Sequence, residues 1–194
     1  MEITPLKSFF NSRSAETQLI KRPKFEENTS ELLKGHAMMS SMRIHLSHFD
    51  EQNFYSRSRD QVQIHQKMLS CMCKVIYGPS TFQRNKKEIQ QVNGFKEVQN
   101  FLACMLPRRQ GKSISMAQFI VCCLLVVKGV NIVLVVNNNK NAENITSKVR
   151  EFLKFFKVSP SSLPTDNKKQ IVYIHPDGSE SKFMSFSGQG KADK

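Results

Sequence analysis

With 194 residues, the chain is long enough for one domain with a substantial core and tails. Its 29 Lys and Arg residues outnumber its 16 Asp and Glu residues, and the formal net charge of +13 favours a polyanionic partner such as DNA, RNA or a nucleotide. The most apolar stretch, residues 114–127, is too short to cross a bilayer and contains polar side chains. We therefore expect a soluble protein with no membrane partner.

The first 50 residues are rich in Ser, Lys and Arg and show only brief apolar periodicity, around Leu32 and Met39. This composition predicts a basic, loosely ordered arm over residues 1–50. The cluster Lys21–Lys24 within it is compatible with a nuclear-import signal or with an ordinary solvated surface.

Alternating helix and strand patterns follow in the rest of the chain. Apolar residues recur at helical spacing over residues 59–77 until Gly78 and Pro79 end the pattern, and residues 81–96 are polar enough for a short helix or a loop. The later segments predict a buried strand (98–106), an apolar helix (112–128), a second buried strand (130–136), an amphipathic helix (142–156) and a hairpin (171–174 with 183–186). The order strand, helix, strand, helix predicts an α/β fold with right-handed parallel crossovers.

The five cysteines form an odd set, and three of them lie in strongly apolar runs, so we expect reduced core residues in an intracellular protein. A zinc site built from His45, His48, His65, Cys71 and Cys73 is the alternative to this interpretation. A Cys-x-Cys spacing on a helix points the two thiols about 200° apart, so they diverge rather than converge on one metal. No zinc is expected.

The segment Leu106–Ser113, with the sequence LPRRQGKS, lies between the first predicted strand and the apolar helix. A Gly-Lys-Ser at the start of such a helix is typical of a phosphate-binding loop (P-loop). Lys112 would reach the β and γ phosphates, Ser113 would offer its hydroxyl to Mg2+, and Gly111 would let the backbone approach the phosphates. Leu106 stands where the usual motif has its first glycine.

With this loop between these strands, the chain resembles the ATPase domain of the large terminase subunit, the DNA-packaging motor of herpesviruses and tailed phages. In the herpesvirus branch the loop is similar to Pro-Arg-Arg-His-Gly-Lys-Thr, preceded by an apolar residue. Pro107, Arg108, Arg109 and the Gly-Lys-Ser of residues 111–113 fit that pattern, whereas Gln110 replaces the histidine. The resemblance covers roughly residues 59–194 and is most specific in the loop.

This resemblance implies an incomplete P-loop NTPase-like three-layer sandwich with parallel central strands and a C-terminal β-hairpin. It implies ATP and Mg2+ as cofactors, with Ser113 as the metal ligand and Arg108, Arg109 and Lys112 as the catalytic residues. The implied cofactor-binding residues are Pro107, Arg108, Arg109, Gln110, Gly111, Lys112 and Ser113. It also implies three partners, which are double-stranded DNA, other terminase subunits and the capsid portal. The implied location is the host nucleus.

A P-loop ATPase needs a second motif, an apolar strand that ends in Asp and usually Glu and holds Mg2+. No such sequence follows Ser113, because Asp166, Asp177 and Glu180 lie in loop or turn contexts. We therefore expect residues 51–194 to be the N-terminal portion of an ATPase domain without its nuclease domain, one piece of a split or spliced gene. Whether this portion acts as an enzyme by itself stays open.

Two alternatives to the motor interpretation remain. One is a non-catalytic DNA-binding or scaffold protein that keeps the P-loop fold, and the other is a helicase-like or different viral P-loop ATPase. A smaller question concerns Gln61, Gln63 and Gln66, near the start of the first predicted helix. These side chains either read an adenine edge, as a glutamine ahead of the loop does in related motors, or form a solvated helix face.

Overall fold

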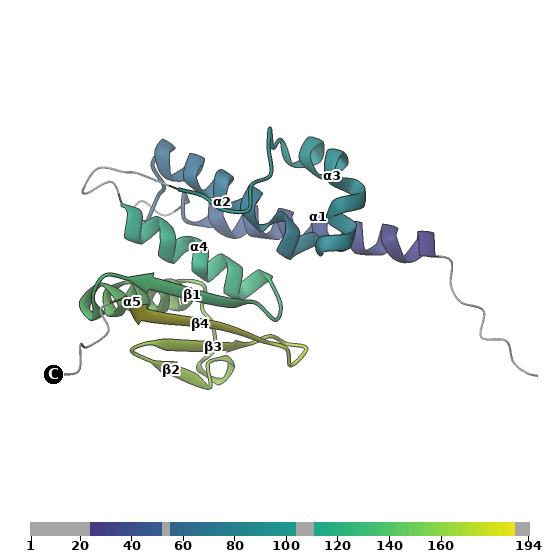
Figure 1. The fold of residues 1–194 in the computed structure, drawn as a ribbon. Coiled ribbons are helices and arrows are strands. Elements are labelled where there is room, and N and C mark those ends of the chain that lie inside the picture. Colours follow the sequence, from purple (N-terminus) through teal and green to yellow (C-terminus); the bar gives the residue numbers. More distant parts are fainter. Residues whose placement is uncertain (1–23, 52–54, 104–110, 189–194) are drawn as a thin grey trace, which may run out of the picture.

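The computed structural model describes residues 24–51, 55–103 and 111–188, which form three layers (Figure 1). The outer layer holds three helices, α1 (Lys24–His48), α2 (Arg59–Tyr77) and α3 (Pro79–Asn93). In the middle, α4 (Lys112–Val126) packs against α1 and α2 on one side and contacts α5 (Asn139–Phe155) and the sheet on the other. The sheet consists of β1 (Asn131–Val136), β2 (Thr165–Asn167), β3 (Gln170–Ile174) and β4 (Glu180–Ser187), with a short 3-10 helix at Pro160–Ser162.

The sheet is mixed, with the strand order β1-β4-β3-β2. β1 and β4 are parallel, whereas β4, β3 and β2 are antiparallel neighbours. The α/β class and the C-terminal hairpin are thus confirmed. The described layers nevertheless run helix, helix, sheet, so within the described residues the helices lie on one side of the sheet rather than on both. Among the four described strands, parallel pairing is limited to β1 with β4.

The predicted central strand over residues 98–106 is wrong for the part that the structure describes. Residues 98–103 contain no strand, Phe101 is 78% exposed, and Leu102 faces the helices α2 and α4. Residues 104–106 lie outside the described ranges. A continuous apolar run fits a buried strand and a helix-packed loop equally well, because strand formation depends on an available sheet edge as much as on residue type.

β1 forms where it was predicted but is covered on one face only. Ile132, Leu134 and Val136 pack on the core, whereas Val133 and Val135 are 55% and 65% exposed. The continuous run of apolar residues predicted burial on both faces, as in an all-parallel sheet. Among the described residues, that second covering layer is not seen.

The prediction of a loosely ordered arm over residues 1–50 is wrong for residues 24–48, which form α1. Met39, Met42 and Leu46 are almost fully buried against the other helices, and Phe49 directly after α1 is buried too. Their spacing of three, four and three residues is helical, but histidines and serines dilute it and the mean hydropathy is low. Tertiary packing therefore stabilises a helix that local composition alone does not indicate.

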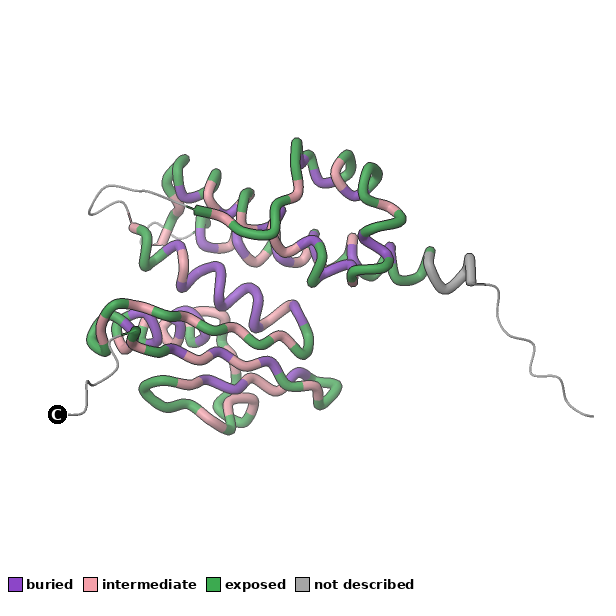
Figure 2. Tube along the Cα trace, in the orientation of Figure 1, coloured by how far each residue is buried: buried purple, intermediate pink, exposed green. Residues whose placement is uncertain are grey.

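The helix α4 is apolar around almost its whole circumference because it lies in the middle layer. All residues from 117 to 124 are buried (Figure 2). Burial raises the pKa of the Cys123 thiol to about 12, so this cysteine stays protonated at neutral pH, as expected for a core residue. None of the helices in the described ranges combines the length and the apolar character needed to cross a bilayer.

An aromatic cluster joins the outer layer to α5. The Phe152 ring lies 4.9 Å from the Phe49 ring and 5.1 Å from the Tyr55 ring, both edge to face, and Phe155 stacks on Phe49 at 5.4 Å. The Tyr55 hydroxyl donates a hydrogen bond to the Glu151 carboxylate at 2.5 Å. Such aromatic pairs add to the burial energy, so this cluster fixes α1 relative to the α/β layers.

Candidate phosphate-binding site

The N-terminus of α4 is built on Gly111, the residue before its first turn. Gly111 has φ 70° and ψ 20°, in the left-handed region that glycine adopts without strain. A Cβ atom at this position would lie 2.6 Å from the Gln61 Nε2 atom, so the end of the Gln61 side chain would have to move if another residue replaced the glycine. The Ser115 amide donates the first helical bond to the Gly111 carbonyl at 2.9 Å, and the amides of residues 112–114 precede that bond and point out of the helix end.

Among the described residues, the N-termini of α2 and α5 are capped by side chains, whereas those of α3 and α4 are not. In α2, Ser58 forms a capping box with Gln61 and Asp60 lies in the first turn, and in α5 the Asn138 side chain accepts a hydrogen bond from the Asn141 amide. The first turn of α4 has neither a side-chain cap nor an acidic residue, and it begins with Lys112. The end of this helix carries partial positive charge and the cationic Lys112 begins it, so the two together favour an anion here.

This helix end lies at the edge of the sheet where the parallel strands β1 and β4 finish (Figure 1). In α/β folds, ligands bind at the carboxyl ends of parallel strands. The Asn137 Oδ1 atom at this edge accepts hydrogen bonds from the Asn138 and Asn141 side chains at 3.3 and 2.8 Å. The turn after β1 is therefore held by its own amides beside the α4 N-terminus.

Two side chains of α2, one helical turn apart, hold the first turn of α4. The Gln61 Nε2 group donates to the Gly111 carbonyl at 3.4 Å, and the His65 Nε2 atom lies 2.9 Å from the Ser115 carbonyl oxygen. The Gln61 Oε1 atom also accepts the Ser58 amide at 2.8 Å. Gln61 is thus a buried capping residue rather than part of a solvated face, and its amide is engaged within the fold.

His65 is neutral in this arrangement. Burial holds its pKa at about 4, below the usual 6.5, although the hydrogen bond to the Ser115 carbonyl favours the protonated ring. The Arg57 Nη1 atom lies 3.3 Å from His65 Nδ1 and its guanidinium pairs with Asp50 at 2.5 Å. The neutral ring donates from Nε2 to Ser115 and accepts from Arg57 at Nδ1. A chain of contacts therefore runs from Asp50 to the first turn of α4.

Acidification is expected to destabilise the protein through His65. As the pH falls from about 6.5 to 4, the unfolded chain binds a proton that the folded His65 does not, so the free energy of unfolding should drop by about 3 kcal/mol. Urea unfolding at several pH values in this window measures the loss. The variant His65→Gln lacks the titrating ring and should show a clearly shallower pH dependence, and equal slopes for both proteins would contradict the assignment.

The structure describes three of the predicted site residues and brings them together at one helix end. Lys112 and Ser113 are exposed there, next to Gly111. Pro107, Arg108, Arg109 and Gln110 lie outside the described residues. From the sequence, His65 was weighed only as a zinc ligand, and its contact with α4 was missed; the signal was a polar residue four positions after Gln61 on an otherwise apolar helix face.

The acidic residues considered as metal ligands make other contacts. Asp166 pairs with Arg150, Asp177 with Lys128 at 2.5 Å, and Glu180 with Lys182 at 2.9 Å. Lys128 follows the far end of α4, about 20 Å from the N-terminus for a helix of this length. Within the described ranges, no group of three His, Cys, Asp or Glu residues is placed to hold a metal ion.

Comparison with known proteins identifies no relative of this chain. No protein-family model matches the chain, and no curated protein matches it.

Proposed function

We propose that the chain is the nucleotide-binding part of a P-loop ATPase of the terminase large-subunit type and binds Mg-ATP at the N-terminus of α4. The observation that carries this proposal is the left-handed Gly111 before an uncapped helix that begins with Lys112 and Ser113. The outward amides and the helix dipole would hold a phosphate group, and Lys112 would add a full positive charge.

The roles of the side chains follow from their chemistry. Lys112 would contact the β and γ phosphates and Ser113 would offer a hydroxyl oxygen to Mg2+, which retains water molecules as its other ligands. Arg108 and Arg109 would stabilise the charge that develops on the transferred phosphoryl group. Because no apolar strand ending in Asp-Glu follows Ser113 in the sequence, hydrolysis would need a carboxylate from elsewhere.

Equilibrium dialysis with labelled ATP tests the proposal. Binding should be measurable at millimolar ATP with excess Mg2+ and should weaken when EDTA removes the metal, because Mg2+ bridges the phosphates and the Ser113 hydroxyl. A protein that retains no ATP under either condition would contradict the proposal.

A second candidate is the non-catalytic DNA-binding or scaffold protein. The observation that favours it is that α3 exposes three cations, Arg84, Lys86 and Lys87, in a chain with a net charge of +13. We propose double-stranded DNA as the partner of both the motor ATPase and the non-catalytic protein. Other terminase subunits and the capsid portal as partners, and a location in the host nucleus, belong to the motor proposal alone.

Binding to a labelled DNA duplex should weaken steeply with salt if phosphate contacts dominate. Neutralising Arg84, Lys86 and Lys87 to glutamine should lower the slope of log affinity against log salt by about 0.9 for each phosphate that these side chains neutralise in the wild-type complex. A matched triple change of Lys140, Lys154 and Lys157, exposed or half-exposed on and after α5, is the control. An unchanged slope in the α3 variant would exclude this surface.

A further inference from the structure

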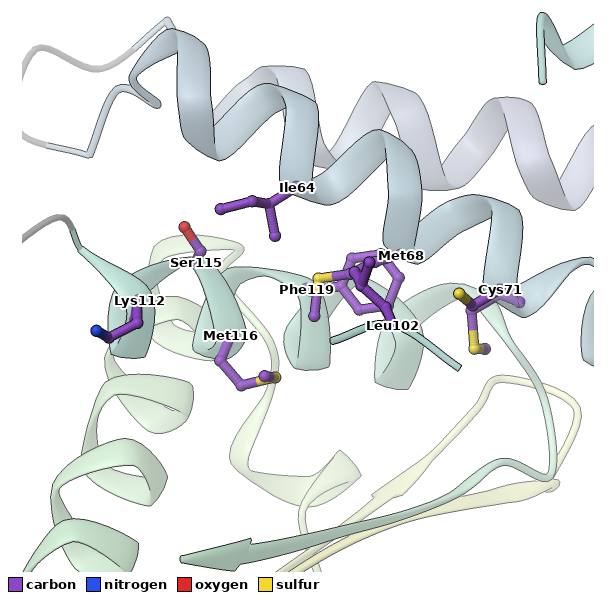
Figure 3. A pocket seen from close by; sticks show the side chains of 9 residues that line it. Ile64, Met68, Cys71, Leu102, Lys112, Ser115, Met116 and Phe119 are labelled. Carbon is purple, nitrogen blue, oxygen red and sulfur yellow. The ribbon is translucent and has the colours of Figure 1, made fainter. Parts of the chain in front are cut away.

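A cavity of about 340 Å³ lies between α2 and α4 and reaches the N-terminal end of α4 (Figure 3). Its walls are apolar, with Ile64 and Met68 from α2, Met116 and Phe119 from α4, and Leu102 from the segment before the loop. Lys112 forms part of its rim at the candidate phosphate site. The volume is within the usual range of small-molecule pockets, about 300–1,000 Å³.

One buried hydroxyl group faces this cavity. Ser115 is 2% exposed and lines the cavity, and its Oγ atom has no hydrogen-bond partner among the described residues. Its side chain points from α4 toward the side of α2 that carries Ile64 (Figure 3). The backbone carbonyl of the same residue is held by His65, which fixes the backbone from which this side chain extends. A buried hydroxyl without a partner is costly, and a ligand group would satisfy it.

The walls and the hydroxyl together define a ligand class. Phe119 and the three thioethers, Met68, Met72 and Met116, suit a flat aromatic ring, since aromatic and sulfur-containing side chains pack favourably on such faces. Ser115 offers one hydrogen bond to the edge of that ring. Lys112 and Phe119 are two helical turns apart on α4, about 10 Å, so a ring in the cavity can be joined to phosphates at the helix end.

We propose that this cavity receives the base of the nucleoside triphosphate whose phosphates lie at the N-terminus of α4. This proposal rests on the proposed nucleotide-binding function. A hydroxyl both donates and accepts hydrogen bonds, so Ser115 satisfies the edge of adenine or of guanine. The amide of Gln61 is held by Ser58 and Gly111 and does not read the base. The site therefore binds ATP and GTP with affinities that differ by about tenfold or less, in contrast to sites with fixed donors and acceptors.

Competition binding with Mg-ATP, Mg-GTP and inorganic triphosphate tests this proposal. Met116→Trp fills the cavity and should weaken ATP and GTP binding by at least about tenfold while triphosphate binding stays the same. Ser115→Ala removes the hydroxyl and should weaken ATP binding by about fivefold, again without effect on triphosphate. Val62→Trp, on the exposed face of α2 at 41% exposure, is the matched control and should change none of the affinities.

The outcomes separate the two proposals. If triphosphate and ATP bind but neither cavity variant alters ATP affinity, the base proposal is overturned and the phosphate site stands. If no triphosphate or nucleotide binds to the wild-type protein, both proposals are overturned. A preference of more than about a hundredfold for one base overturns the role of Ser115. If Met116→Trp also weakens the binding of triphosphate, the ATP affinity of Ser115→Ala is the deciding measurement. An unchanged ATP affinity in Ser115→Ala then overturns the proposal.

Discussion

Mg-ATP is expected to raise the melting temperature of the wild-type protein and to leave that of Lys112→Ala unchanged. A ligand at a hundred times its dissociation constant stabilises the folded state by about 2.7 kcal/mol. For a chain of this size that corresponds to roughly 5–10 °C. Lys112 supplies the full charge at the end of α4, so its loss should remove most of the binding energy. Thermal unfolding followed by circular dichroism measures both proteins with and without the nucleotide.

Lys140→Ala is the matched control for this experiment, because Lys140 is an exposed lysine at the start of α5, the neighbouring helix. It should respond to Mg-ATP like the wild-type protein. The melting temperature of Lys112→Ala without nucleotide should be close to the wild-type value, since Lys112 is exposed. An equal ATP response of Lys112→Ala and Lys140→Ala would show that the nucleotide does not use Lys112.

Phe152→Ala is expected to cause the largest loss of stability among single changes in the aromatic cluster. Phe152 is fully buried and its ring contacts Phe49 and Tyr55, so truncation leaves a cavity where the outer helices join α5. Such changes cost about 3–5 kcal/mol. Urea unfolding should therefore show a much lower midpoint with an unchanged slope.

The control for this prediction is Phe101→Ala, since Phe101 is 78% exposed and should change the free energy of unfolding by less than about 0.5 kcal/mol. A similar loss in both variants would mean that Phe152 does not join the layers as described.

The elements with strong hydrophobic periodicity could be predicted from the sequence. The helix over residues 59–77 has the predicted bounds, and the apolar helix from Lys112, the strand before Asn137 and the hairpin around Gly178 are also confirmed. Each of these has local signals that agree with its packing: a capping box at Ser58, a glycine after α4, and a tight turn between β-rich segments.

The wrong predictions fall where tertiary contacts outweigh the local pattern. Residues 98–103 do not enter the sheet, because Leu102 faces α2 and α4 whereas Phe101 is exposed, and β4, a distant segment, is the parallel neighbour of β1. Similarly, α1 is helical because Met39, Met42 and Leu46 find partners in other helices. A single-sequence pattern contains no information about which edge or face is available.

The same distinction applies to the candidate site. The glycine and lysine at the start of α4 follow from a local motif, because their chemistry depends on adjacent residues. The contacts of Gln61 and His65 with α4 join residues 50 positions apart, and the cavity beside Ser115 exists only because α2 and α4 pack together. No spacing in the sequence encodes such contacts.

The most direct test of the phosphate site is a two-dimensional amide NMR spectrum of isotope-labelled protein, recorded while Mg-ATP is added. The site predicts that the largest shift changes fall on the amides of Lys112, Ser113 and Ile114, which point out of the end of α4 and would donate to phosphate oxygens. Inorganic triphosphate should shift the same amides. The phosphate site at this helix would be contradicted if saturating Mg-ATP left the signals of these three amides unshifted. It would also be contradicted if only signals from the outer helices shifted.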